Sequence, residues 1–456
     1  MKKAFWTHPS VLALAKDEDA VDVISGKSKE MILKAIELGW DGPPYDPFEM
    51  ARLMGVATVP RGDTRDARLI STSGKKLRIE YNPNRPPTRI RFSVAHELGH
   101  SLFPDCHERV RKRLAPGEMR DDEWQIEALC NLAASEILMP FGYLKELTSQ
   151  HPSMETLLGL RDRLVVSTEA LLLRYVKLCQ HPCMMFCASA CDGNRTRPSY
   201  KIDYAVPSPC FSSSPRPGVV LPKSSCVADC TAIGYTAKGN ESWPTVGDAR
   251  VECVGAPSYP GEPLPRVVGL LFKKAAHCGR TAEIEYVRGD ATEPHGRGAK
   301  IIAHVVNDKA RAWGAGFGYA VRMKWPDAQQ AFKDWIDENS ERHTLGSVKT
   351  TRLGSGLFLF TMIAQHGYGP SRRPRIRYMH LSSCLEMLAA LAEKQKASIH
   401  MPRLGCGEGG GAWFITEQMI HENLCSRGLH VTVYDLPSRR ERRASQQLSL
   451  FGGNTP

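Results

Sequence analysis

Hydrophobic and polar positions along the chain follow three different patterns. Residues 1 to about 150 alternate helical spacing with short strand-like runs, ending in a periodic helix from about Asp122 to Met139 that stops at Pro140. From Pro182 to about Pro265, short β-like runs stand among Pro, Gly, Ser and Cys, which predicts a small β-rich domain. Beyond Ala282, strand-like runs alternate with helical stretches, which favours a helix-flanked, mostly parallel sheet.

Residues 154–178 have helical spacing that supports two interpretations. The stretch LRDRLVVSTEALLLRYVKL resembles a helix-turn-helix, with Val166 and Ser167 at the turn and the next helix running from Thr168. Plain packing helices give the same pattern. Direct DNA binding therefore stays open as a prediction.

These patterns predict a multidomain protein of the α+β and α/β classes. Length alone suggests about two to four domains. We expect a first domain over residues 1–180 with a helical extension, a β-rich middle domain over 181–278, an α/β domain over 279–438 and a flexible tail over 439–456.

Composition narrows the class of protein. Hydrophobic residues make up 42% and charged residues 24%, which is a globular profile. No stretch approaches the roughly 18 apolar residues of a membrane helix, and the start lacks a convincing signal peptide, so we expect a cytoplasmic protein. The net charge of +11 favours acidic partners such as nucleotides, though weakly. In that compartment the fourteen cysteines would be reduced thiols.

The sequence RFSVAHELGHSLF contains the strongest chemical motif. His96 and His100 are one helical turn apart, so both imidazoles can reach one ion, and Glu97 stands beside them as a base. Zinc in such a site activates water for attack on a peptide carbonyl. The five-residue pattern also occurs by chance, but its apolar flanks and a downstream glutamate helix favour a real zinc site.

A catalytic zinc site normally takes a third ligand from the protein. Glu127, on the helix WQIEALCNLAASEILMP, is the preferred candidate, and Asn131 one turn later is placed to orient a ligand. Glu123 and Glu136 are alternatives. His107 is disfavoured because the residues after His100 lack the Gly-x-x-His continuation of metzincins.

The stretches RIRFSVAHELGHSLF and IEALCNLAASEILMP resemble the ImmA/IrrE family of metallopeptidases, over about residues 25 to 180. The resemblance implies a zincin-like fold and zinc-dependent cleavage of a regulatory, repressor-like protein, often after a stress signal. The chain departs from the family at Leu132 and Ala133, where a phenylalanine is usual; this concerns packing, not ligation.

Two glycine-rich turns follow strands in the C-terminal part, VVNDKARAWGAGFGYAV and MPRLGCGEGGGAWF. Glycines let backbone N–H groups approach phosphate oxygens, and a helix N-terminus behind each turn adds partial positive charge. Two such loops can grip a diphosphate from both sides. The loop residues are Gly314, Ala315, Gly316, Phe317 and Gly318, then Gly405, Cys406, Gly407, Glu408, Gly409, Gly410 and Gly411.

The ordered set of GDAT, Asn-Asp, the first loop and PRLGCGEGGGAW resembles macro domains over about residues 282 to 437. The resemblance implies a three-layer α/β/α fold and ADP-ribose or an ADP-ribosylated macromolecule as ligand. By the same resemblance, Asp290 accepts the adenine amino group and Asn307 faces the distal ribose.

Hydrolysis of ADP-ribose links is a separate question. Two interpretations exist for the polar residues Lys324, Asp308 and Glu408. They are either groups that act in hydrolysis or surface charges beside a binding loop. In macro domains that use a lysine and aspartate pair, the acid stands where this chain has Gly409. Sensing is therefore preferred to hydrolysis.

Two smaller patterns remain. Cys179, Cys183, Cys187 and Cys191 recur every four residues, as do Cys226 and Cys230; buried thiols are favoured over a metal cluster because Cys-x-x-Cys pairs are missing. In the tail, Gln447, Leu448, Leu450 and Phe451 match the peptide that docks bacterial proteins onto the sliding clamp.

Together these features predict a zinc endopeptidase acting on a repressor-like protein, with Glu97 as its base and with control by ADP-ribose binding. The alternatives are an ADP-ribosyl hydrolase that the N-terminal half targets, and a sensor recruited to replicating DNA through the tail.

Overall fold

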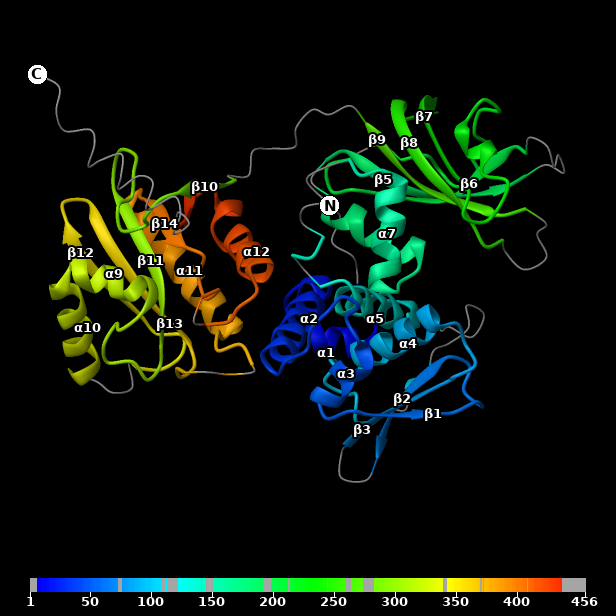
Figure 1. Cartoon of the computed structure of the whole chain (residues 1–456). Coiled ribbons are helices and arrows are strands. Elements are labelled where there is room, and N and C mark those ends of the chain that lie inside the picture. Colours follow the sequence, from blue (N-terminus) through cyan, green and yellow to red (C-terminus); the bar gives the residue numbers. More distant parts are fainter. Residues whose placement is uncertain are drawn as a thin grey trace, which may run out of the picture. The chain divides into compact units, whose positions relative to one another are not determined.

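The computed structural model describes residues 6–72, 76–108, 111–112, 122–140, 142–144, 147, 151–179, 181–191, 198–211, 214–243, 245–258, 264–273, 283–338, 343–369, 371, 373–407 and 409–436. The chain divides into two compact units (Figure 1), one of residues 1–36 and 40–279 and one of residues 37–39 and 280–456. Among the described helices, none is long and apolar enough to cross a membrane. The prediction of a multidomain protein with mixed helices and sheets is confirmed.

The first unit begins with a helical layer beside a small sheet. Its helices are α1 (Pro9–Ala15), α2 (Ala20–Glu37), α3 (Pro47–Leu53), α4 (Pro87–His100) and α5 (Glu123–Leu138). Its strands are β1 (Ala57–Pro60), β2 (Ala67–Thr72), β3 (Lys76–Tyr81) and β4 (Arg111–Lys112). The sheet order is β1-β3-β2-β4, with β1 parallel to β3 and the other pairs antiparallel.

Local sequence sets where two of these helices begin. The Asp46 side chain caps α3 by accepting a hydrogen bond from the Phe48 N–H. Helix α4 starts at Pro87, whose missing N–H costs nothing in the first turn. The buried faces of α1, α2 and α5 then meet in one apolar core that includes Phe103.

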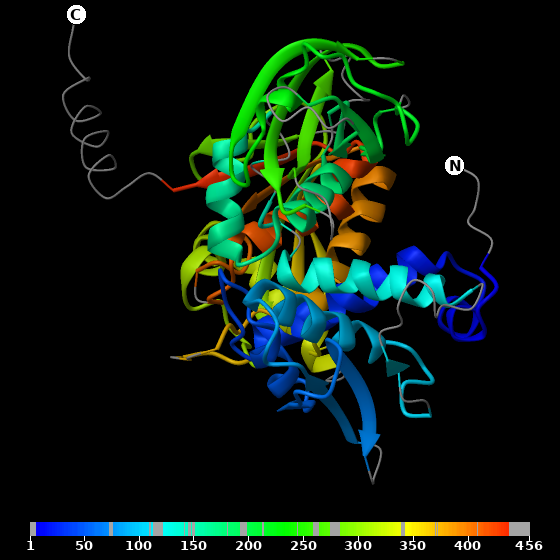
Figure 2. The same ribbon diagram turned by 90° about the vertical axis from the view of Figure 1, so that its right-hand side faces the viewer.

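The first unit continues with α7 (Met154–Leu164), α8 (Thr168–Leu178) and a five-stranded antiparallel sheet. In sheet order its strands are β6 (Tyr200–Pro207), β5 (Cys183–Ala190), β9 (Arg266–Lys273), β8 (Gly247–Ala256) and β7 (Thr236–Trp243). A short 3₁₀ turn, η1 (Cys226–Asp229), precedes β7. Figure 2 shows these strands as curved green arrows.

Helix α8 starts at Thr168, as the sequence predicts, after a Ser167 cap that accepts a hydrogen bond from the Ala170 N–H. It packs against β5, β6 and β9. Lys177 is the only exposed residue along its length. A recognition helix needs a free polar face to enter a DNA groove, so the packing-helix interpretation fits α8 better.

The second unit is built around a six-stranded sheet. In sheet order its strands are β10 (Ile284–Arg288), β15 (Val431–Asp435), β14 (Ser398–Pro402), β11 (Lys300–Asn307), β13 (Leu357–Gln365) and β12 (Val348–Gly354). All neighbours are parallel except β12, which runs antiparallel to β13 at the edge.

Helices cover both faces of this sheet (Figure 1): α9 (Gly316–Lys324), α10 (Pro326–Glu338), α11 (Tyr378–Gln395) and α12 (Trp413–Asn423), followed by the 3₁₀ turn η3 (Cys425–Arg427). Helices α9 and α10 bury Val321, Phe332 and Ile336 against Ile302 and Ile363 of β11 and β13. Helix α11 packs on β13 and α12 packs on α11. The result is an α/β/α arrangement in which both glycine-rich loops follow strands of the parallel part.

Candidate functional site

Helices α4 and α5 cross in close contact and bring the motif residues together. On α4, His96 is fully buried, and Glu97 and His100 are 1% and 2% exposed. Gly99 makes the contact possible, because a Cβ there would lie 3.1 Å from the Cβ of Ala133 and the backbone of Cys130. The absent side chain allows α5 to approach the two histidines.

Glu127 projects from α5 toward both rings. The Nε2 atom of His96 lies 3.3 Å from Oε2 of Glu127, and Nε2 of His100 lies 3.7 Å from Oε1. The two rings meet edge to face, with centroids 4.9 Å apart. The side chains that the sequence singles out thus converge on one point.

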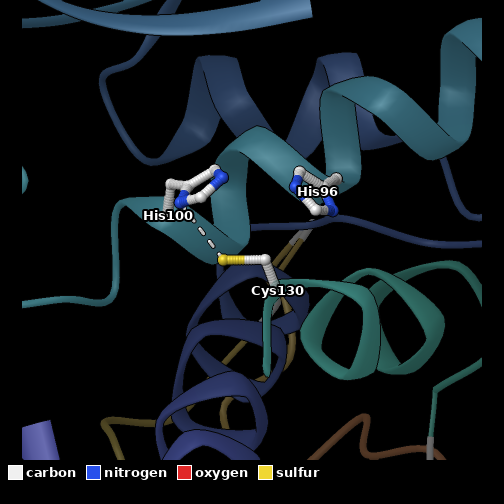
Figure 3. A group of neighbouring side chains, drawn as sticks. All are labelled: His96, His100 and Cys130. Atoms are coloured by element: carbon white, nitrogen blue, oxygen red, sulfur yellow. Dashed lines mark hydrogen bonds between the residues drawn. The ribbon is translucent and has the colours of Figure 1, made fainter. Parts of the chain in front are cut away.

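The opposite nitrogens of the rings also face α5. Asn131 Oδ1 lies 3.0 Å from Nδ1 of His96. Cys130 Sγ lies 3.3 Å from Nδ1 of His100, as the dashed line in Figure 3 marks. Sequence reasoning did not identify Cys130, although it stands next to Asn131.

This donor set fits a zinc ion. Ligand bonds of about 2.0–2.2 Å in a tetrahedron separate ligand atoms by about 3.3–3.6 Å, close to the spacing of the Nε2 atoms from Glu127. Within the described residues, Nε2 of His96 is buried and makes no hydrogen bond. A buried nitrogen of this kind is suited to binding a metal.

The alternative ligands lie elsewhere. Glu123 is paired with His8 at 3.9 Å. Glu136 accepts a hydrogen bond from Ser25 and forms a buried ion pair with Arg174 at 3.3 Å. His107 is exposed. None of them is among the groups around His96 and His100.

The regularly spaced cysteines do not gather into a ligand set in the part of the chain that the structure describes. Among the described residues, His96, His100 and Cys130 have ligand atoms within 4.8 Å of one another, and none of the regularly spaced cysteines belongs to this group. Cys179, Cys183, Cys187, Cys226 and Cys230 are buried, whereas Cys191 is exposed. Cys230 and Cys253 place their sulfurs 3.6 Å apart as free thiols.

The second unit contains a cavity of about 760 Å³ at the carboxyl ends of its parallel strands. Both glycine-rich loops line it, together with Asp290 and Asn307. Lys309, Arg311 and Arg403 add positive charge to its wall, and Trp313 and Tyr368 add aromatic surface. These last five residues were not predicted, because they come from loop positions without a fixed spacing.

The predicted loop residues divide into two groups. Gly314 to Gly318 line the cavity, as do Gly405, Gly407 and Gly409. Cys406, Gly410 and Gly411 are not among the lining residues, and the Cys406 thiol donates to the Leu404 carbonyl at 3.3 Å. Glu408 lies outside the described residues, as does the tail with Gln447, Leu448, Leu450 and Phe451.

Lys324 and Asp308, the two described residues considered for hydrolysis, form other contacts. Lys324 Nζ donates to Thr292 O and pairs with Glu293, both at 3.1 Å. Burial raises the pKa of the Asp308 carboxyl, but hydrogen bonds from the Gly367 N–H and His366 outweigh it and leave this pKa below its ordinary value.

Gly409, which stands where hydrolytic relatives would carry an acid, leaves no space for one. A Cβ at this position would lie 2.5 Å from the Gly405 carbonyl oxygen. The backbone as folded therefore excludes an aspartate here.

Comparison with known proteins finds relatives of two kinds. Residues 55–175 match the family model of the IrrE N-terminal-like domain, a peptidase family. The radiation response metalloprotease IrrE of Deinococcus radiodurans is 35% identical over 102 residues, 21% of this chain and 29% of that protein. The mouse chromodomain-helicase-DNA-binding protein 1-like is 30% identical over 178 residues, 37% of this chain.

This chain spans about a fifth, 19%, of the mouse relative's length. Among solved structures, a macrodomain protein from Streptomyces coelicolor is 40% identical and aligns with 34% of this chain and 99% of its own, at a TM-score of 0.30.

Helices α4 and α5 lie within the residues of the first unit, 55–175, that match the IrrE N-terminal-like peptidase domain. More narrowly, the chain carries an IrrE-like peptidase domain at residues 55–175 and is similar to macrodomain proteins over about a third of its length. The predicted resemblance to both families is confirmed.

Proposed function

We propose that the first unit is a zinc-dependent endopeptidase that cleaves a repressor-like regulatory protein. The observation that carries the proposal is the convergence of both Nε2 atoms on Glu127, at 3.3 and 3.7 Å, in a buried site. His96, His100 and Glu127 would hold the ion. Zinc, when bound, supplies activation of water and polarisation of the peptide carbonyl.

The protein's own groups have separate roles in this proposal. Glu97 follows His96 on α4 and is 1% exposed. It acts as the base that takes a proton from the attacking water and passes it to the leaving amine. Asn131 accepts a hydrogen bond from Nδ1 of His96 and so keeps Nε2 directed at the ion. Burial of the site strengthens these charge interactions.

The second unit, in this proposal, binds ADP-ribose or an ADP-ribosylated macromolecule and controls cleavage. A cavity of about 760 Å³ with two glycine loops and three cationic side chains suits an anionic diphosphate. Asp290, which lines the cavity, would accept the adenine amino group and Asn307 would face the ribose. The lack of space at Gly409 favours sensing over hydrolysis.

We also propose a link of the peptidase to stress, docking of the tail onto the sliding clamp and a cytoplasmic location. The family resemblance supports the repressor-like substrate and the link to stress, and the motif at Gln447 to Phe451 supports the docking. Hydrolysis of ADP-ribose links is the alternative function of the second unit.

The test combines cleavage with ligand binding. Zinc-loaded full-length protein is incubated with helix-turn-helix repressors, with and without ADP-ribose, beside a Glu97→Gln variant of the same shape. We expect cleavage that depends on ADP-ribose and falls by about 10²–10⁴-fold in Glu97→Gln. Equal cleavage by Glu97→Gln would refute the assigned base, and calorimetry showing no ADP-ribose binding would refute the sensor.

A further inference from the structure

Residues of one turn of α5 contact the Nε2 and the Nδ1 atoms of both His96 and His100. Glu127 lies toward the Nε2 atoms of both rings. Three and four residues later, Cys130 and Asn131 face the Nδ1 atoms of His100 and His96, at 3.3 and 3.0 Å. Residues at these spacings share a helix face, so α5 presents one contiguous surface to the histidines.

We propose that Cys130 is a positioning residue of the metal centre, which holds His100 as Asn131 holds His96. This inference rests on the proposed zinc site of the first unit. The Cys130 thiol is fully buried. The next residue, Asn131, makes the corresponding contact with Nδ1 of His96.

The physical reason lies in the tautomer of the imidazole. A neutral ring binds a metal through the lone pair of one nitrogen, so the other nitrogen carries the hydrogen and must donate it. For His96 the acceptor is Asn131 Oδ1. For His100, Nδ1–H donates to Cys130 Sγ, which directs the Nε2 lone pair toward Glu127.

Ligation by the sulfur is the competing role, because His96, His100 and Cys130 form a group with ligand atoms within 4.8 Å of one another. Cys130 faces Nδ1 of His100, whereas the ring atoms that converge on Glu127 are the Nε2 atoms. His96 has its Nδ1 beside Asn131, while its buried Nε2 makes no hydrogen bond within the described residues. Because the sulfur also lies within 4.8 Å of a ligand nitrogen of each histidine, the test below includes a direct readout of sulfur ligation.

The test measures metal binding instead of peptidase activity. Zinc affinity of the full-length protein is measured by competition with a chromogenic chelator for the wild type, Cys130→Ala, Cys130→Ser and Glu127→Ala. Cys106→Ala, which removes another buried thiol of the same unit, is the matched control. Cobalt-loaded wild type is tested for a sulfur-to-metal charge-transfer band.

We expect Cys130→Ala to weaken zinc binding about 10–100-fold, Cys130→Ser to restore it through its hydroxyl acceptor, and Cys106→Ala to match the wild type. A folded Cys130→Ala protein with wild-type affinity, or a serine variant as weak as the alanine variant, would overturn the positioning role. A charge-transfer band lost in Cys130→Ser would make the thiol a ligand instead. Zinc binding that survives Glu127→Ala would refute the proposed site itself, which is a distinguishable outcome.

Discussion

The contact at Gly99 offers a test of how closely α4 and α5 must approach. In Gly99→Ala the new Cβ would lie 3.1 Å from Ala133 Cβ and from the Cys130 backbone. Carbon atoms prefer about 3.5–4.0 Å, so the helices must separate by roughly half an ångström. Distances between a metal and its ligands tolerate deviations of about 0.2 Å. Because the histidines are on α4 and Glu127 is on α5, the change should disturb ligation directly.

We expect Gly99→Ala to lose about 1–3 kcal/mol of stability from overpacking and to bind zinc about tenfold or more weakly. Gly159→Ala is the control, since Gly159 lies inside α7 and a Cβ added there would have no other atom within 4 Å. That variant should gain about 0.5–1 kcal/mol from helix propensity and keep its zinc affinity. Urea unfolding and chelator competition measure both quantities. If Gly99→Ala behaves like Gly159→Ala, the close approach is not what assembles the site.

Two further predictions concern burial and space. Burial raises the pKa of the Glu136 carboxyl, whereas Arg174 and Ser25 lower it. Arg174→Met would leave this buried carboxylate without its cation, so it should lower the free energy of unfolding by about 3–5 kcal/mol at neutral pH. In the variant, the carboxyl of Glu136 has a raised pKa in the folded protein, so it becomes protonated as the pH falls through that pKa and part of the lost stability should return. Urea unfolding at several pH values checks this. A loss that does not depend on pH would contradict it. Gly409→Asp should weaken ADP-ribose binding without creating hydrolysis, since its Cβ would meet the Gly405 carbonyl oxygen at 2.5 Å. Calorimetry and an ADP-ribose release assay test this, with release of ADP-ribose as the contrary result.

The proximity of the three proposed metal ligands was predictable because helical spacing carries the information. His96 and His100 are one turn apart, and Glu127 lies on a periodic helix that the structure places against them. Cys130 was not predicted, although its spacing from Glu127 places it on the same helix face; the ring nitrogen that it contacts depends on how α5 is rotated against α4. The orientation becomes visible only once Gly99 and Ala133 are seen in contact.

Strands were predicted unevenly for a similar reason. The parallel strands β11, β13 and β14 are apolar runs between turns and stand out in the sequence. Edge strand β12 is not among the predicted strands; its residues are mostly polar and half or fully exposed, so its pairing with β13 is decided by tertiary contact. Cys406 likewise is not among the residues that line the cavity, and its thiol donates to the Leu404 carbonyl, a local contact that the glycine-rich sequence does not fix.

The central claim is that two imidazoles of α4 and a carboxylate of α5 hold a single ion. The most direct measurement is the zinc content of the purified full-length protein by elemental mass spectrometry, for the wild type and for Glu127→Ala. The account predicts that the wild type carries zinc and that the substitution removes it while the protein stays folded. Zinc retained in equal amount by Glu127→Ala would contradict the account.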